Sequence, residues 1–374
     1  MSKWETMRKS LGLAKGAAKR LAGKYDATKH TGAPEKIQPF KPSTAALLEK
    51  ASRKAPELTL AVNHMPDAWK DHNPHLIHGL KPAGIESLGS GDNLTPNVRL
   101  AANKHDPDLH VVVKPGLDGD QLGDIHSSLP NSHFGEYSTA HREAAYHRLA
   151  DKFFGMGKYV PETTIFEHPE TKQAHSAQRF IPNTEPFAMM SHNESKDWMD
   201  QHVGTADTQK LGIMNTLLGN NDRHRYNILA GHDNKLHMID HGFTFDYGHR
   251  FAHLTPQYLH RDHLEGSLTP ETHKWIDSLN PEDFKEHLAR TGMPPKLAAI
   301  AYGRLWELQR WSKRERQRQA SGQQEGSGKL GNGLQLMRLH HFNHDTGAQP
   351  DVNRMEAQRA RLEDATEILP PKGK

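Results

Sequence analysis

Cysteine is absent from the 374-residue sequence. Disulfides, thiolate-bound metal sites and cysteine nucleophiles are therefore excluded. Long apolar runs are absent too, since no stretch approaches the roughly 18 residues that a membrane-spanning helix requires. Residues 1–24 carry scattered Lys and Arg without a continuous apolar stretch, so no secretory signal is expected. These absences predict a soluble cytoplasmic protein or, if the chain is viral, one of the bacterial host cytoplasm or the virion.

Apolar residues and net charge are both scarce. Only 34% of the residues are hydrophobic, the mean hydropathy is −0.82 and the formal net charge is +3. This composition favours a globular centre between polar, partly disordered ends. The charge is uneven, because residues 1–60 hold 13 Lys and Arg against 5 Asp and Glu. Such a basic arm suits nucleic acid, anionic lipid or an acidic protein surface, and equally a solvated tail.

Apolar periodicity predicts a small sheet followed by helices. Residues 109–114 are rich in β-branched side chains and are expected to form a strand. A helix is expected from about residue 138, because its apolar side chains recur every three or four residues. The other expected strands are 85–88, 97–101, 160–166, 176–181, 226–230 and 235–239, and the other expected helices are 207–219, 283–290, 295–318 and 355–368. The first part of this order outlines a sheet with one helix packed on it.

Residues 218–246 (LGNNDRHRYNILAGHDNKLHMIDHGFTFD) are the most informative stretch. Phosphoryl transfer needs a carboxylate to orient the accepting hydroxyl and oxygen ligands to hold Mg²⁺. Asp222 and Asn227 are five residues apart on one expected loop. Asp240 follows Asn227 by thirteen residues, at the end of a strand that can return beside this loop. The sequence therefore predicts that two acids and an amide converge on one site.

This stretch resembles the catalytic core of the phosphatidylinositol 3- and 4-kinase-like branch of the kinase superfamily. That branch carries Asp-Arg-His-x-x-Asn and then Ile-Asp-[Phe/His]-Gly. The matching residues here are Asp222-Arg223-His224-Arg225-Tyr226-Asn227 and Ile239-Asp240-His241-Gly242. The resemblance implies that Asp222 orients or deprotonates the acceptor hydroxyl, with His224 near the transferring phosphate. It also implies that Asn227 and Asp240 bind Mg²⁺ or Mn²⁺. Arg223 is expected to brace the loop.

The resemblance extends to the residues upstream. Gly89, Ser90 and Gly91 would cover the phosphates of ATP with backbone N–H groups. Lys114 would pair with the α- and β-phosphates and complete the catalytic set. Glu143 would hold Lys114 through an ion pair, with Glu136 as its rival just before the expected helix.

The segment 178–181 would join the two lobes, and its residues Gln178 and Phe180 would hold adenine through backbone hydrogen bonds. The implied fold is α+β, a bilobal protein-kinase-like fold with a small sheet-plus-helix N-lobe and a mainly helical C-lobe. The expected divisions are a basic arm (1–79), the N-lobe (80–182), the C-lobe (183–318) and a flexible linker with a C-terminal helix (319–374).

Several departures from the family leave the acceptor open. The glycine loop lacks the third glycine of the protein-kinase pattern, and no Ala-Pro-Glu signature follows Asp240. The basic substrate loop of lipid kinases is not evident, although His249-Arg250 and His260-Arg261 are candidates. The compact bacterial kinases related to the HipA toxin share this architecture and phosphorylate proteins. The leading hypothesis is thus an ATP- and Mg²⁺-dependent Ser/Thr protein kinase, with a lipid or a small molecule as alternative acceptors.

Two other classes of function compete with a kinase. A kinase-fold scaffold within a larger assembly, such as a virus particle, could use the basic arm or the C-terminal helix to bind its partner. A nucleic-acid-binding protein is the weakest hypothesis, because no base-reading motif or aromatic stacking pattern accompanies the arm. The 28 histidines raise a further question of zinc, for which His224, His237 and His241 are the only credible ligands near the motif.

Overall fold

The computed structural model describes residues 64–82, 98–103, 105–106, 108–118, 137–220, 222–245, 266–321, 329–330 and 334. The chain divides into two units, Met1–Lys41 and Pro42–Lys374, and every described residue belongs to the second. The strand expected at 85–88, the glycine loop at 89–91 and the helix expected at 355–368 lie outside the described residues. Among the residues described, no helix has both the length and the apolar character needed to cross a membrane.

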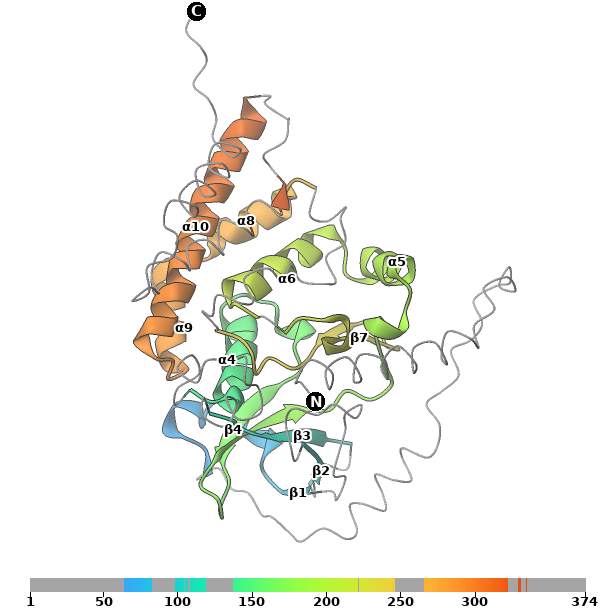
Figure 1. Ribbon diagram of the computed structural model, residues 1–374, viewed down its shortest axis with the longest axis vertical. Coiled ribbons are helices and arrows are strands. Elements are labelled where there is room, and N and C mark those ends of the chain that lie inside the picture. Colours follow the sequence, from blue (N-terminus) through green and yellow to red (C-terminus); the bar gives the residue numbers. More distant parts are fainter. Residues whose placement is uncertain are drawn as a thin grey trace, which may run out of the picture. The chain divides into compact units, whose positions relative to one another are not determined.

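The N-terminal part is a five-stranded antiparallel sheet in the order β1-β2-β3-β5-β4 (Figure 1). Its strands are β1 (Leu80–Pro82), β2 (Arg99–Asn103), β3 (His110–Pro115), β4 (Thr163–Glu167) and β5 (Ala174–Arg179). The strands predicted at 97–101, 109–114, 160–166 and 176–181 are thus present, with ends shifted by one to three residues. Strand β1 was missed because a three-residue edge strand is too short to show alternation.

Helix α4 (Thr139–Lys152) packs against β4 and β5. Its start is tied to the end of β3, since the Thr139 N–H donates to the Leu117 carbonyl and the Leu117 N–H donates to Thr139 Oγ1. The apolar positions that predicted this helix, among them Ala144 and Leu149, are fully buried. The sheet and α4 therefore form the predicted unit.

Residues 64–79 belong to this same core. They include two short 3₁₀ turns, Asp67–Trp69 and Pro74–Leu76, and bury Trp69, Leu76 and Ile77 almost completely. The boundary predicted at residue 79 therefore lies too late. It was missed because these apolar residues follow neither a helical nor a strand period.

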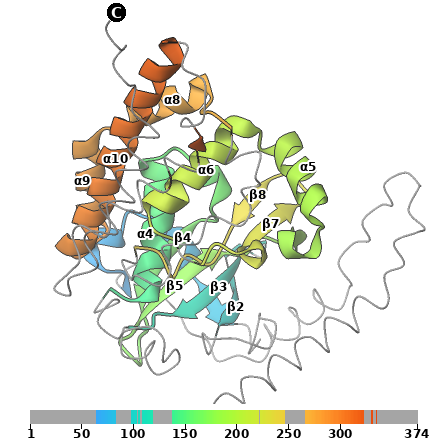
Figure 2. The ribbon, with the colours of Figure 1, turned by 45° about the horizontal axis from the view of Figure 1, so that its top comes forward.

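The C-terminal part combines helices with a three-stranded sheet. The strands β6 (Thr184–Pro186), β7 (Ile228–Gly231) and β8 (Leu236–Met238) are antiparallel and lie close to α5 (Figure 2). The helices are α5 (His192–His202), α6 (Thr205–Leu217), α8 (Pro270–Ser278), α9 (Pro281–Arg290) and α10 (Pro295–Ala320), and further 3₁₀ turns are Gly157–Tyr159, Phe187–Met189 and Arg225–Asn227. The predicted α+β class, a sheet-rich part followed by a helical part, is confirmed.

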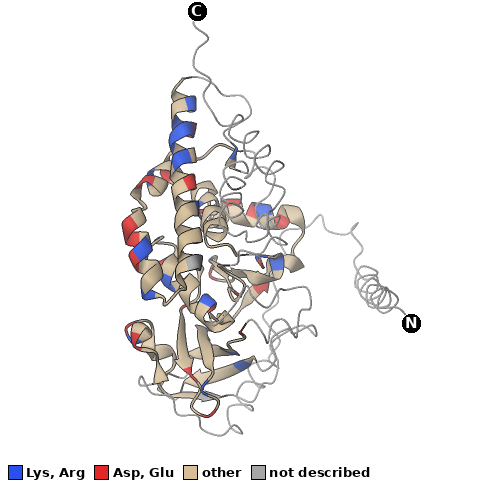
Figure 3. Ribbon diagram, turned by 60° about the vertical axis from the view of Figure 1, so that its left-hand side comes forward, with Lys and Arg blue, Asp and Glu red and all other residues tan. Residues whose placement is uncertain are grey.

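Two of these helices were not predicted. Helix α5 buries only Ser195 and Met199, too few residues for a periodic signal. Its start is instead marked by a capping box between Ser191 and Glu194. Helix α8 begins at Pro270 after the N-cap Thr269. Helix α10 was predicted within two residues of its end, and Lys and Arg gather on its C-terminal part (Figure 3).

Candidate active site

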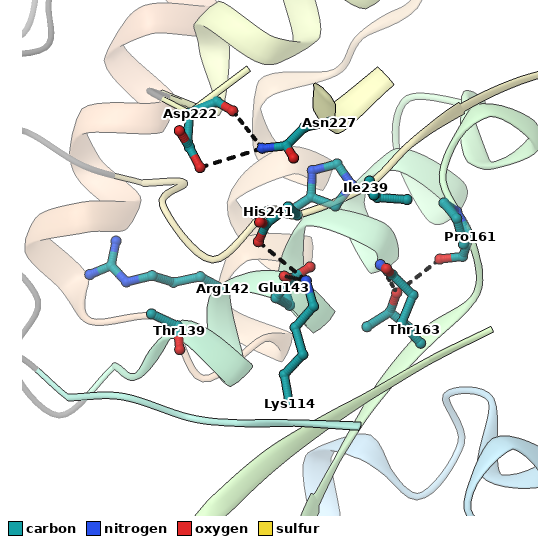
Figure 4. Close-up of polar contacts among 12 residues, drawn as sticks. Lys114, Thr139, Arg142, Glu143, Pro161, Thr163, Asp222, Asn227, Ile239 and His241 are labelled. Carbon is teal, nitrogen blue, oxygen red and sulfur yellow. Dashed lines mark hydrogen bonds and ion pairs between the residues drawn. The ribbon is translucent and has the colours of Figure 1, made fainter. Parts of the chain in front are cut away.

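The loop between α6 and β7 carries Asp222 and Asn227. Asn227 ends a 3₁₀ turn and donates its amide hydrogens to the Asp222 backbone carbonyl at 2.9 Å and to Asp222 Oδ2 at 3.4 Å (Figure 4). The amide nitrogen is thus turned to Asp222, which directs the amide oxygen elsewhere. The carboxylate of Asp222 is 36% exposed, so it is accessible to a substrate.

Arg223 braces this loop, as predicted. Its buried guanidinium donates to the carbonyls of Asn227 at 2.8 Å and Ile239 at 2.5 Å, and so joins the loop to the end of β8. It also donates to Asn215 Oδ1 on α6 at 3.2 Å and to His241 Nδ1 at 2.5 Å. One side chain therefore holds the two segments that supply Asp222 and Asp240.

Asp240 lies just after β8 and faces Lys114 of β3. The Lys114 ammonium is 3.2 Å from Asp240 Oδ1 and 2.6 Å from Glu143 Oε1 on α4. The ion pair predicted between Lys114 and Glu143 is therefore present, and the rival Glu136 lies outside the described residues. Asp240 adopts a left-handed backbone conformation with φ of 58°. Residues other than glycine rarely adopt that backbone conformation, and residues strained in this way are concentrated at functional sites.

The glycine of the Ile-Asp-His-Gly motif allows α4 to approach this segment. A Cβ atom at Gly242 would lie 3.1 Å from the Cβ of Thr139, at the first turn of α4. From the other side, Arg142 of α4 donates to the Thr244 carbonyl. The segment after Asp240 is thus packed closely against the helix that carries Glu143.

The charges at this site are unequally compensated. Burial alone would lower the pKa of Lys114, but Asp240 and Glu143 raise it above its ordinary value. Burial would likewise raise the pKa of Asp240, yet Lys114 holds it below its usual range. For Asp222, burial and then the charge of Asp240 raise the pKa to about 6. Burial raises the pKa of Glu143 as well, although Lys114 opposes that shift, so Asp222 and Glu143 are both carboxylates whose charge is incompletely compensated.

The three histidines near the motif have separate partners. His241 is fully buried, stacks on Tyr146 at 3.8 Å between ring centroids, and accepts from Arg223, so its Nε2 donates to the Met238 carbonyl. His237 lies beside Asp233 in the β7–β8 hairpin. His224 is 3.5 Å from Asp222 Oδ1, consistent with its expected place at the site. Within the described ranges, no group of three His, Asp or Glu side chains could hold a metal ion by itself.

The adenine contacts expected from Gln178 and Phe180 need correction. Gln178 lies within β5 between two neighbouring strands, and its side chain donates to Thr163 Oγ1. The N–H of Phe180 already donates to the His110 carbonyl at 2.8 Å. Both residues are thus paired within the sheet, so their N–H groups do not serve the adenine contacts expected of them.

Four site residues were not predicted from the sequence: Arg142, Tyr146, Asn215 and Arg225. Arg225 donates to the carbonyls of Phe187 and Met190 at 2.7 and 2.8 Å and thereby fixes the segment before α5. The hydrogen-bond partners of these four residues are mostly backbone carbonyls or residues distant in the sequence. No local sequence pattern therefore predicts their role at the site.

Comparison with known proteins supports the motif-based resemblance. Residues 138–290 match the family model of phosphatidylinositol 3- and 4-kinase. The predicted resemblance is thereby confirmed, and the match covers the helix with Glu143 and the segment with Asp222, Asn227 and Asp240. A curated relative, phosphatidylinositol 4-kinase gamma 3 of Arabidopsis thaliana, is 30% identical over 162 residues, which cover 38% of this chain and 26% of the relative. The chain thus spans about a quarter of that relative's length. Among solved structures, the proinflammatory kinase CtkA of Helicobacter pylori aligns with 71% of this chain and 98% of its own, at 10% identity and a TM-score of 0.38.

Replacing Arg223 with methionine is expected to lower the free energy of unfolding by about 3 kcal/mol, because buried acceptors at Asn227, Ile239 and Asn215 would lose their donor. Urea unfolding measures the change. The matched control is Arg290→Met, which removes an exposed ion pair with Glu286 on α9 and should cost less than about 1 kcal/mol. Equal losses in the two variants would contradict the bracing role.

Proposed function

We propose that this chain is an ATP- and Mg²⁺-dependent phosphotransferase that transfers phosphate to an alcohol group, with Mn²⁺ able to replace Mg²⁺. The observation that carries the proposal is the position of the Lys114 ammonium between Glu143 and Asp240. Lys114 comes from the sheet, Glu143 from α4 and Asp240 from the segment after β8. A purely structural ion pair does not require three elements to meet beside an accessible carboxylate such as Asp222.

Each residue has a distinct task in this proposal. Lys114 binds nonbridging oxygens of the α- and β-phosphates, and Glu143 keeps its amine in place. Asp222 accepts a hydrogen bond from the acceptor hydroxyl and so orients its oxygen for attack on the γ-phosphorus. His224, next to Asp222, donates to an oxygen of the transferring phosphate. The glycines at 89 and 91 are proposed to cover the phosphates, together with Ser90.

The residues present fit a divalent cation. Asp240 and Asn227 offer a carboxylate and an amide oxygen, which are hard ligands suited to Mg²⁺ or Mn²⁺ rather than zinc. Burial, and then the charge of Asp240, raise the pKa of Asp222, and a cation would offset the second of these effects. When bound, the ion would neutralise charge on the phosphates.

A protein serine or threonine is the acceptor that we favour. The cation on the described part of the loop that could face a phosphorylated headgroup is Arg225, and its guanidinium is instead turned toward backbone carbonyls near α5. The neighbouring Tyr226 is 59% exposed and offers an aromatic surface whose ring centroid is 6.0 Å from that of His224. An uncharged hydroxyl-bearing side chain suits this surface better than a phosphate-rich lipid.

A lipid is the second candidate, because residues 138–290 match a lipid-kinase family model. A kinase-fold scaffold with no activity and a small-molecule kinase stay as further alternatives. Incubation of the full chain with γ-labelled ATP and Mg²⁺ separates these functions. We expect label on protein when a bacterial lysate is added, and no label on phosphatidylinositol vesicles. Label on the lipid alone would favour the second candidate, and no transfer to any acceptor, with Mg²⁺ or Mn²⁺, would favour a scaffold.

A further inference from the structure

The segment Met65–Gly79, which we call the strap, connects α4 to the sheet. It begins beside the C-terminal half of α4, passes the edge strand β4 and continues into β1. Its buried residues Trp69, Leu76 and Ile77 anchor it in the core. None of these residues belongs to the site described above, and all precede the segment that matches the kinase family.

The strap contacts α4 through two consecutive residues of the helix, His147 and Arg148. Arg148 donates to the Ala68 carbonyl at 2.6 Å, and its guanidinium lies over the Trp69 ring at 5.2 Å. His147 accepts a hydrogen bond from His72 at 3.1 Å, and both rings are buried. His147 is one helical turn from Glu143, so the two residues lie on neighbouring positions of one helix face.

The strap also forms hydrogen bonds with the sheet in the same region. Thr164 of β4 donates its hydroxyl hydrogen to the His72 carbonyl at 2.6 Å. Asn73, held in a left-handed conformation with φ of 51°, donates to the Thr163 carbonyl at 3.4 Å. Further along, Asn103 of β2 donates to the carbonyls of His75 and His78 at 3.3 and 2.9 Å. The strap thus fixes the position of α4 relative to the sheet that carries Lys114.

We propose that the strap positions Glu143 against Lys114. In this proposal the His72–His147 hydrogen bond holds the strap to α4 and is sensitive to protonation. His72, His147 and Arg148 are positioning residues, since they act on the nucleotide site only through α4. The inference rests on the proposed function for its effect on ATP, but not for its effect on α4.

The hydrogen-bond pattern makes the contact between His72 and His147 sensitive to protonation. Asn73 Nδ2 also lies 3.4 Å from His147 Nδ1 and can only donate, so this ring nitrogen is the acceptor and His72 Nε2 carries the hydrogen. Protonation of His147 at Nδ1 would place a third donor against these two. The bond in this direction, with both His72 and Asn73 donating to His147, therefore requires a neutral His147.

The charged groups around the pair also decide its titration. They are Arg148, Asp151 and Lys152 on α4, Asp71 on the strap, Glu162 before β4 and His241 after β8. Burial, and then the positive neighbours, lower the pKa of His72 to about 3. Burial lowers the pKa of His147 to about 4, although Asp151 and Glu162 oppose the shift.

The direction of the pH effect follows from these shifts. A displaced strap exposes both rings and returns each pKa to about 6.5, the ordinary value for histidine. Closure is therefore fully favoured above pH 6.5 and is weakened as the pH falls toward the lowered values. Between pH 7.5 and 5.5, opening should become more favourable by up to about 10-fold per histidine, or about 100-fold for the pair.

Hydrogen–deuterium exchange of α4 in the full chain tests the proposal without ATP or an acceptor. We expect exchange of the α4 amides, corrected for intrinsic rates, to rise by 10- to 100-fold between pH 7.5 and 5.5 in the wild-type chain. The variant His72→Gln/His147→Gln should lose this dependence, because glutamine does not titrate. His273→Gln is the matched control, since His273 is also buried but bonds Ser312 on α10, and its α4 exchange should follow the wild type. Exchange that is independent of pH in the wild type, or equally dependent in the double variant, would overturn the proposal.

Single variants keep the test decisive if the double variant does not fold. His147→Gln alone should remove about half of the pH response on a logarithmic scale. Arg148→Ala at pH 7.5 should raise the KM for ATP by about 10-fold and leave the KM for the acceptor unchanged, as expected if Glu143 is displaced. Faster α4 exchange with an unchanged KM for ATP would overturn the positioning role. Absence of transfer by the wild type would instead refute the proposed function and leave the exchange result standing.

Discussion

Replacing Asp222 with asparagine is expected to lower the rate of phosphoryl transfer by about 10³-fold while raising the free energy of unfolding by about 1 kcal/mol. The loss of rate follows because asparagine has the size of aspartate but cannot accept the proton or the strong hydrogen bond of the acceptor hydroxyl. The gain in stability follows because Asp222 carries a charge that burial and Asp240 disfavour. Function and stability should thus move in opposite directions at this position.

The size of the stability change depends on pH. The pKa of Asp222 in the folded chain is about 6, above its ordinary value of 3.8, so the folded chain binds the proton more tightly. Its charge therefore destabilises the fold fully above pH 6, and the penalty disappears as the pH falls toward 3.8. We keep the expected gain near 1 kcal/mol because the carboxylate is 36% exposed and partly screened by water.

Urea unfolding in the presence of EDTA, at pH 8 and at pH 4.5, measures this effect without metal. The stabilisation of Asp222→Asn should be fully present at pH 8 and reduced to about a third at pH 4.5. Asp197→Asn, at an exposed position of α5, is the control and should change neither stability nor transfer. A variant that transfers phosphate at the wild-type rate would exclude Asp222 from the reaction, and one that is less stable at pH 8 would refute the electrostatic account.

Replacing Asp240 with alanine is expected to lower transfer by a similar factor of about 10³ and to make nucleotide binding independent of Mg²⁺. The variant removes the proposed carboxylate ligand and leaves Lys114 with Glu143 as its remaining anionic partner among those described. Alanine is less suited than aspartate to the left-handed conformation at this position. Asp240→Asn, which tolerates that conformation, should therefore be measured beside it.

Titration of ATP with and without Mg²⁺ gives the binding result, and the γ-label assay gives the rate. Asp233→Asn is a suitable control, because Asp233 lies in the turn between β7 and β8 and its ion pair with Lys235 is at the surface. If folded Asp240→Ala protein transfers phosphate at a near-normal rate, Asp240 is not part of the reaction. Stoichiometric zinc that survives dialysis, with ATP binding indifferent to Mg²⁺, would remove the basis for the kinase mechanism altogether.

The local sequence was sufficient to predict most of the proposed catalytic segment. Asp222, Asn227 and Asp240 are close enough along the chain that one loop and one short hairpin bring them together. Apolar periodicity predicts the helix that carries Glu143, and β-branched residues predict the strand that carries Lys114. The order of these elements and the motif then predicted the ion pair, which spans 29 residues and is present in the structure.

What the sequence determined by itself was therefore the α+β class, the order of the main elements and the acids, amide and lysine of the proposed site, because these depend on short-range patterns. Tertiary structure decided the rest. The strap has no period of its own and is defined only by the helix and sheet that it contacts, as the His72–His147 bond across 75 residues shows. Arg142 and Arg225 bond to backbone carbonyls, which every residue possesses, so no residue type in the partner segment reveals them. The pKa of Asp222 likewise depends on burial and on the distance to Asp240, and both exist only once the chain is folded.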